Sequence, residues 1–109
     1  MTDRLVNLDA LNASLQQFVR ARNWEQYHSP KNLAMALTGE VGELVEIFQW
    51  LTEEQSRSVA HNPETAEAVR DELADVLIYL VELAAALGVD MNEAVTAKIA
   101  KNAIKYPAP

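Results

Sequence analysis

Two acidic pairs in the sequence have the spacing and the setting of a metal site. Glu40 and Glu43 form the first pair, and Glu72 and Asp75 form the second. Residues three apart lie on the same face of a helix, and both pairs sit in strongly apolar helical patterns. Like charges beside a core are destabilising unless a cation separates them. If the pairs face each other, they form an oxygen-rich cage of the kind that Mg²⁺ or Mn²⁺ prefers.

The second pair belongs to a polar seam on an otherwise apolar helical segment. With Glu72, the side chains of Asp75, Tyr79 and Glu82 recur at i, i+3, i+7 and i+10. Buried carboxylates need a counter-charge, yet Arg70 is the one basic residue between positions 63 and 87. A divalent cation is therefore expected. A ligand set without His or Cys favours Mg²⁺ or Mn²⁺ over zinc.

Carboxylate-held Mg²⁺ usually binds a substrate phosphate as well. It clamps a polyphosphate and lowers the pKa of a bound water, which a free carboxylate can orient or deprotonate. We therefore predict hydrolysis of a phosphoanhydride bond, with metal ligands and catalytic residues Glu40, Glu43, Glu72 and Asp75. The sequence contains no GxxxxGK[ST] loop, and no Ser–His or Cys–His arrangement stands out. The alternative is a pair of solvated helix faces, because Glu is a good helix former.

Length, composition and charge limit the classes of protein to consider. The chain has 109 residues, half of them hydrophobic, and a formal net charge of -7. The length favours a single domain over residues 1–109, and the charge argues against nucleic-acid binding through phosphate contacts. The absence of cysteine excludes disulfides and thiol chemistry. No apolar run approaches the roughly 20 residues of a membrane span, so we expect a cytoplasmic protein without a membrane partner.

Apolar spacing and capping residues predict an all-α fold with four main helices. Ser29-Pro30 and Asn62-Pro63 are cap-plus-proline helix starts, and Gly88 is a helix stop. We expect a lead-in over 1–7, a helix over 8–22, a loop over 23–29 and a second helix from Pro30, whose apolar stripe extends as far as Leu51. The capping residues Thr52 and Gln55 predict a short helix or turn over 53–60. The last two main helices are expected from Asn62-Pro63 to Leu87 and from the capping pair Asp90 and Glu93 to about Lys105.

The helix that ends at Leu87 is apolar on more than one face. Its expected core stripe is Leu73, Val76, Leu77, Leu80, Ala84 and Leu87, and its second apolar face is Ala74, Ile78, Val81 and Ala85. A helix that is apolar on several faces must be covered on several faces. Four short helices of one subunit can hardly provide that cover. We therefore expect a four-helix, bundle-like fold that assembles as a homo-oligomer.

Aromatic residues flank the acidic pairs. The loop 23–29 carries Trp24, Tyr27 and His28, and one interpretation is a hydrophobic plug beneath that loop. Tyr79 lies one turn beyond Asp75, and Trp50 lies two turns beyond Glu43. Each therefore lies alongside the acidic pairs on its own helix. Trp24, His28, Trp50 and Tyr79 are candidate ligand-binding residues, and the resemblance described next makes them a nucleoside pocket, although stacking by itself does not choose the base.

These motifs, taken together and in order, resemble those of the MazG-like all-α nucleoside triphosphate pyrophosphohydrolases, and in particular the small dCTP pyrophosphatase branch. The resemblance covers residues 14 to 107 and depends on an ExxE helix followed by an ExxD helix. The matching segments are Trp24 to His28, Pro30-Lys31-Asn32-Leu33, Gly39-Glu40-Val41-Gly42-Glu43-Leu44, Phe48-Gln49-Trp50, Asp71 to Leu80, and Tyr106-Pro107. Either acidic helix alone is a weak signal, whereas both with the flanking aromatics are specific.

The resemblance implies a function and a set of roles. It implies Mg²⁺-dependent hydrolysis of a nucleoside triphosphate, with dCTP or a related dNTP as substrate, to the monophosphate and pyrophosphate in nucleotide-pool house-cleaning. It makes the four carboxylates Mg²⁺ ligands, places the nucleoside near the aromatic residues, and puts Lys98 and Asn102 on the phosphate side. It also implies obligate oligomers, which are tetramers in the small dCTP-type members. The choice of cytosine comes from the resemblance alone.

Two departures and three alternatives accompany this interpretation. Many MazG domains have two consecutive glutamates where this chain has Gly39-Glu40, a change that the dCTP branch shares. The chain also stops soon after Tyr106-Pro107, whereas some relatives continue with a Gly- and Lys-containing tail. A dUTP/dUDP hydrolase or a phosphoribosyl-ATP pyrophosphohydrolase would use related acidic helices. A non-catalytic helical oligomerisation or regulatory module would bind metal only structurally.

Overall fold

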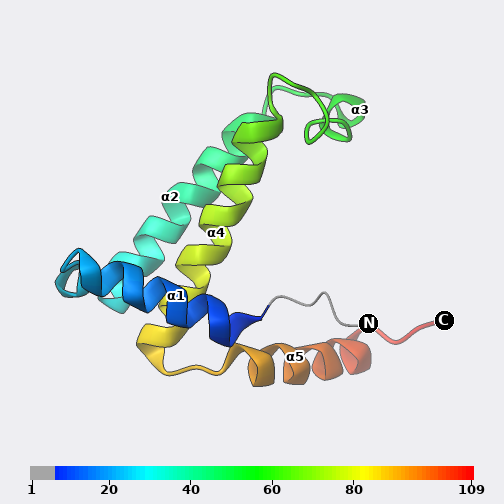
Figure 1. Ribbon diagram of the computed structural model, residues 1–109. Coiled ribbons are helices and arrows are strands. Elements are labelled where there is room, and N and C mark those ends of the chain that lie inside the picture. The colour runs from blue at the N-terminus through cyan, green and yellow to red at the C-terminus, as the bar shows by residue number, and fades with distance from the viewer. Residues whose placement is uncertain (1–6) are drawn as a thin grey trace.

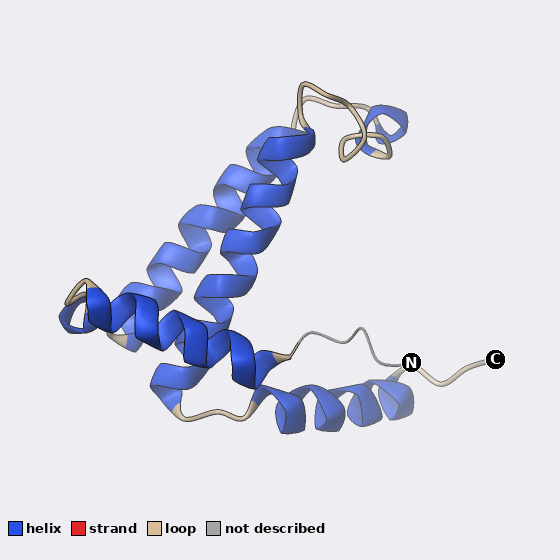
Figure 2. Ribbon diagram, in the orientation of Figure 1, coloured by secondary structure: helices blue, strands red, loops and turns tan. Residues whose placement is uncertain are grey.

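Helices and the turns between them form the whole of residues 7–109, which are the residues that the computed structural model describes (Figure 1). No strand occurs in this range (Figure 2), so the all-α prediction is confirmed. The predicted lead-in over 1–7 lies outside the described residues, except for Asn7. The elements are α1 (Leu8–Ala21), the 3₁₀ turn η1 (Glu25–Tyr27), α2 (Pro30–Phe48), α3 (Glu53–Ser56), α4 (Ala66–Leu87) and α5 (Met91–Lys105).

The two longest helices, α2 and α4, form an antiparallel hairpin that makes the main packing contact of the chain. Helix α1 crosses the end of the hairpin where α2 begins, and it makes a smaller contact with α4 (Figure 1). The short α3 belongs to the connection from α2 to α4, at the opposite end of the hairpin (Figure 1). Helix α5 projects away from the hairpin (Figure 1). Within residues 7–109, no helix is long and apolar enough to span a membrane.

Capping side chains fix most helix ends where the sequence places them. The Asn7 and Ser29 side chains accept hydrogen bonds from the first turns of α1 and α2. Thr52 and Gln55 form a complete capping box that begins α3, and the Asp90 side chain accepts from the Glu93 amide at the start of α5. Gly88 ends α4 in a left-handed conformation, with φ of 69°, which glycine adopts without a Cβ clash.

The predicted start of α4 at Asn62-Pro63 is wrong by three residues, because local hydrogen bonds hold that segment in a turn. The Asn62 side chain accepts from the Glu64 amide at 2.9 Å, two residues along. The Thr65 hydroxyl donates to the Val59 carbonyl at 2.7 Å. Side-chain hydrogen bonds of this kind compete with the helical pattern. Regular helix therefore begins only at Ala66.

Few apolar side chains are buried within the single chain. Val19, Leu33, Val81 and Ala84 are buried at the end of the hairpin where α1 crosses, and Val59 and Val69 are buried at the α3 end. Every residue of α5 except Met91 is exposed. Many large apolar side chains of α2, α4 and α5 are exposed. They include Met35, Val41, Val45, Leu73, Leu80, Leu87, Val95, Ile99 and Ile104.

The predicted core stripe of α4 is therefore wrong for the single chain. Leu73 and Leu87 are more than half exposed, and of the predicted stripe only Ala84 is fully buried. The reason is the orientation of the hairpin. Its two helices face each other along the flanks that carry Glu40 and Glu72, so the apolar stripes beside those flanks turn outward.

Candidate metal and nucleotide site

Three carboxylates from the two hairpin helices meet in one cluster. Glu40 and Glu43 come from α2, and Glu72 comes from α4. Each residue offers one carboxylate oxygen such that these oxygens lie within 4.8 Å of one another. The helical spacing of three puts the first two on the same side of α2, and the antiparallel packing brings Glu72 opposite them. The predicted meeting of the two acidic helices is thus observed.

Asp75 adjoins this cluster through Glu40. Partial burial raises the pKa of Glu40, and the negative charges of Glu43 and then Asp75 raise this pKa further, together with hydrogen bonding to both groups. Burial likewise raises the pKa of Glu72 to about 7, with contributions from hydrogen bonding to Glu43 and from the other carboxylate charges. The four predicted ligands therefore form one electrostatically coupled group, in which each negative charge disfavours the next.

The Glu72 carboxylate has an oxygen that the protein leaves without a partner. Its Oε2 atom is buried, and among residues 7–109 no group donates a hydrogen bond to it. A buried acceptor without a donor is costly, and a cation in the cluster would remove that cost. The donor set consists only of carboxylate oxygens on two rigid helices, which matches the preference of Mg²⁺ or Mn²⁺. The residues present therefore fit a hard divalent cation.

A cavity of about 370 Å³ opens directly beside the acidic cluster. Asp75 and Tyr79 of α4 form the side nearest the cluster. Apolar and aromatic side chains make most of the remaining wall: Leu15, Phe18 and Val19 from α1, Trp24 from the following loop, and Ile78 from α4. Phe18 and Trp24 pack edge to face with ring centroids 5.7 Å apart. This is an aromatic, half-open pocket of the type that holds small ligands.

The cavity contains three of the predicted nucleoside-binding residues, Trp24, His28 and Tyr79. Burial raises the pKa of the Tyr79 hydroxyl, and the charges of Glu40, Glu82 and Asp75 add to the effect, so Tyr79 stands between the acidic cluster and Glu82. Sequence reasoning placed Glu82 on the polar seam but gave it no role, and it did not single out Phe18. The signal for Glu82 was its position at i+7 from Asp75.

Trp50, Lys98 and Asn102 do not line this cavity. Helix α2 ends at Phe48, so Trp50 lies in the turn beyond it and is 86% exposed. Trp50 is about 30 Å along the α2 direction from His28, at the rise of a regular helix. Lys98 and Asn102 belong to the exposed α5. Within one chain, the predicted six-residue substrate site is therefore only half assembled, and the roles of these three residues stay predictions.

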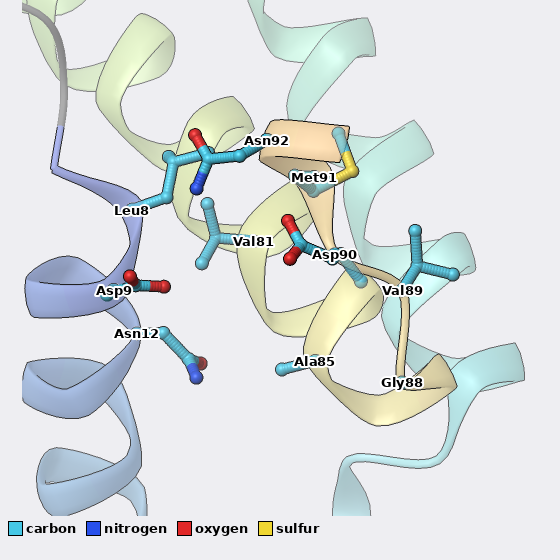
Figure 3. Close-up of a pocket in the computed structure, with 11 residues that line it drawn as sticks. Leu8, Asp9, Asn12, Val81, Ala85, Gly88, Val89, Asp90, Met91 and Asn92 are labelled. Carbon is cyan, nitrogen blue, oxygen red and sulfur yellow. The ribbon is translucent and has the colours of Figure 1, made fainter. Parts of the chain in front are cut away.

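Two further hollows contain no member of the acidic cluster. One, of about 360 Å³, shares Val19, His28 and Glu82 with the aromatic cavity and extends to Asn12 and Gln16 on α1. The other, of about 300 Å³, lies where α1 and α5 both begin, beside the end of α4. Figure 3 shows Asp9 and Asn12 on one side of it, and Val81 and Ala85 on the other.

Comparison with known proteins places these features in a family. The family model described as MazG-like matches residues 36–109, which include all four carboxylates. The chain belongs to the MazG-like family. It is 48% identical over 91 residues to dCTP pyrophosphatase 1 of Bos taurus and 49% identical over 92 residues to dCTP pyrophosphatase 1 of Homo sapiens. These matches cover 84% of this chain and 54% of each relative, so the chain spans about half the length of the curated relatives that it matches.

A solved structure shares the fold of this chain. A crystal structure of a pyrophosphatase from Archaeoglobus fulgidus matches it with a TM-score of 0.85 at 38% sequence identity, over 99% of both chains. The all-α fold of this chain of the MazG-like family therefore agrees with that of a solved structure over nearly its whole length.

The raised pKa of Glu72 predicts that the metal-free protein loses stability as pH rises. Glu72 holds its proton more tightly in the folded chain than in the unfolded one, so its contribution is complete below pH 4.5 and lost as pH rises through about 7. In EDTA, we expect Tm to fall over that window, and Mg²⁺ to raise Tm most above it. Thermal unfolding followed by circular dichroism measures both.

The matched variants are Glu72→Gln, which removes this titration, and Glu67→Gln, which removes an exposed carboxylate from the first turn of the same helix. The first should flatten the dependence of Tm on pH, and the second should leave it as in the wild type. An unchanged slope in Glu72→Gln would contradict the assignment.

Proposed function

We propose that the protein hydrolyses a nucleoside triphosphate to the monophosphate and pyrophosphate, with a divalent cation held by Glu40, Glu43, Glu72 and Asp75. The observation that carries this proposal is the contact between two unlike features. A carboxylate cluster with a buried, donorless oxygen lies directly beside an aromatic cavity, and Asp75 belongs to both. Such a boundary fits a ligand with a polyanionic end and a flat, apolar end.

The chain's own residues position the substrate in this proposal. Trp24 and Tyr79 offer aromatic faces to the base, and His28 offers a polar group at the far side of the cavity. The apolar wall of Leu15, Phe18 and Ile78 excludes water from the nucleoside end. A rigid hairpin holds the four carboxylates, so the reacting phosphates are oriented without reorganising the protein.

The carboxylates have two tasks. Most of them hold the cation, and one that is not engaged accepts the proton of the attacking water. When bound, Mg²⁺ supplies the positive charge that neutralises a triphosphate and acidifies water. Mn²⁺ satisfies the same oxygen ligands. The outer glutamate that many MazG domains carry before Glu40 is replaced here by Gly39.

We infer that the substrate is dCTP or a related deoxynucleotide, and that the protein removes such nucleotides from the cytoplasmic pool. Two supports exist. The curated relatives are named dCTP pyrophosphatase 1, and their matching regions include both acidic helices. The cavity volume of about 370 Å³ is in the range of a small-molecule site. The same pocket would accept dUTP in shape, so the choice among bases depends on polar contacts.

We further propose that the protein is a homo-oligomer, in which a tetramer completes the site. The large exposed apolar residues of α2, α4 and α5 exceed what a monomer normally presents. Gly39 and Gly42 lie in the middle of α2, and among residues 7–109 a Cβ at either position would meet nothing within 4 Å. A second copy that packs closely there explains both the glycines and the exposed stripes. It would also explain how Trp50, Lys98 and Asn102 reach a substrate.

Loss of a cluster carboxylate should abolish turnover while leaving the fold intact. Glu40→Gln and Asp75→Asn should each lower kcat by about two orders of magnitude or more, because each weakens metal binding and the orientation of the phosphates. Pyrophosphate release from a panel of dNTPs with Mg²⁺ is the measurement, and circular dichroism checks helix content. Glu67→Gln is the matched control. Near-wild-type turnover of either cluster variant at saturating Mg²⁺ would remove that residue from the ligand set.

Loss of a base-stacking aromatic should raise KM more than it lowers kcat. Stacking is worth about 1–3 kcal/mol per base, so Trp24→Ala should raise KM by roughly 5- to 150-fold. Tyr27→Ala is the control, since Tyr27 is in the same loop but does not line the cavity. Trp50→Ala should raise KM similarly only if a second copy brings Trp50 to the cavity. If Trp24 merely closes the core, its loss lowers Tm and leaves KM unchanged.

The assembly can be tested in dilute solution. Light scattering should give a mass about four times that of the 12.1 kDa chain, because the exposed apolar stripes need cover. Ile99→Asp introduces a charge into the exposed apolar side of α5 and should shift the mass toward smaller species, whereas Lys101→Asp changes a charged position and serves as the control. A stable helical monomer of the wild type would disprove the oligomer.

A further inference from the structure

Glu82 is the one fully buried acidic side chain among residues 7–109. It lies on α4 and is 7% exposed, although α4 turns several large apolar residues outward. Its side chain lines the aromatic cavity on one side and the neighbouring hollow on the other. A carboxylate in such a place is costly unless something donates to it. Its carboxylate oxygens keep some exposure, unlike the Glu72 Oε2 atom, so a ligand in the cavity can reach them.

The protein supplies only an incomplete partner. The basic side chain that lies beside it is His28, with 3.9 Å between its Nδ1 atom and the Glu82 Oε2 atom, which is too long for a hydrogen bond. Among residues 7–109, no group donates a hydrogen bond to the Glu82 side chain within hydrogen-bond distance. Burial raises the pKa of Glu82, and the charge of His28 opposes that shift. The carboxylate thus retains free acceptor capacity toward the cavity.

The distance of Glu82 from the acidic cluster matches the far end of a nucleoside. It follows Asp75 by seven residues on the same polar seam, which corresponds to about 10 Å along the helix axis. Tyr79 lies between them on that seam and is influenced by both. If the phosphates occupy the cluster and the base lies between Trp24 and Tyr79, the edge of the base points toward Glu82.

We propose that Glu82 is a specificity-determining residue, whose carboxylate accepts a hydrogen bond from the exocyclic amino group of the substrate base. This inference rests on the proposed function and deepens it. It assigns to the site the class of amino-bearing bases, cytosine among the pyrimidines, and it excludes keto pyrimidines such as uracil and thymine. His28 lines the same cavity, with its Nδ1 atom 3.9 Å from the Glu82 Oε2 atom.

The physical basis of the selection is the unlike pattern of the two base edges. Cytosine presents an N4 amino donor where thymine and uracil present the O4 acceptor, and carboxylates commonly accept from the cytosine amino group. A keto oxygen against Glu82 would bring two acceptors together in an apolar pocket and leave both without a donor. A site built around a hydrogen bond rejects an analogue that lacks the donor far more strongly than an apolar pocket rejects a change of size.

The test compares the kcat/KM of dCTP with that of dUTP in the wild type and in two variants. Glutamine offers both a carbonyl acceptor and an amide donor, so Glu82→Gln should reduce the preference for dCTP by about 10-fold or more, mainly through KM. Glu82→Ala should also reduce it. Glu67→Gln removes an exposed carboxylate from the same helix and should keep the wild-type ratio. A wild type without preference, or an unchanged ratio in both Glu82 variants, overturns the inference while leaving the proposed function standing.

A binding measurement separates failure of the inference from failure of the proposed function. Titration of the protein with deoxycytidine and with deoxyuridine in EDTA, followed by isothermal calorimetry, needs no turnover. We expect tighter binding of deoxycytidine to the wild type and near-equal binding of the two nucleosides to Glu82→Gln. A protein that hydrolyses no triphosphate but keeps this difference refutes the proposed function alone. Equal binding, or binding of neither nucleoside, refutes the role of Glu82.

Discussion

Repulsion between carboxylates across the α2–α4 interface is the constraint on which the other features of this protein depend. An interface between two long helices normally gains stability from apolar packing along its whole length. Here the middle of the interface carries Glu40, Glu43 and Glu72, with a buried oxygen to which no group of residues 7–109 donates a hydrogen bond. The metal-free chain therefore loses folding stability at this interface. Such a loss is expected where residues serve a binding site at the expense of stability.

The direction of the carboxylates also determines which surfaces remain for other contacts. Because the acidic flanks face inward, Val41, Leu73 and Leu80 face outward, and α5 presents Val95 and Ile99 without cover. The chain is thus a hairpin with α1 as its main additional packing element. The geometry that brings the carboxylates together thus also leaves apolar surface exposed. The proposed site and the proposed assembly both depend on this one helix orientation.

Beside the cluster, the cavity divides its chemistry along the polar seam of α4. Asp75 borders the cation region, Tyr79 lies in the middle, and Glu82 lies at the inner end, with about one helical turn between each. In the function that we propose, one helix therefore contacts the phosphates, the nucleoside and the edge of the base in that order. Helix α1 and the loop after it supply the opposite wall through Phe18 and Trp24. The division requires no movable element within the described part of the chain.

The local signals of the sequence determined the helices and the spacing of the acidic residues, since they act over short distances. Ser29, Thr52 and Asp90 cap helices because each has a side-chain acceptor three residues before a free amide. The spacing of three residues places Glu40 beside Glu43 on one helix face, whatever the tertiary fold. The same reasoning misplaced the start of α4, because the side chains of Asn62 and Thr65 form hydrogen bonds in a competing turn.

Only the tertiary structure decided which faces meet, because apolar periodicity marks a face without naming the surface that covers it. Leu73 and Ala84 belong to the same apolar pattern, yet one is exposed and the other buried. Tertiary packing also brought Trp24 and His28 to Tyr79 across some fifty residues of sequence. It buried Glu82 of α4 in a cavity that α1 also lines, whereas Trp50 stayed exposed at the far end of α2. The positions of Trp24, His28 and Glu82 in one cavity depend on the crossing of α1 over the hairpin, and no local pattern of residues encodes that crossing.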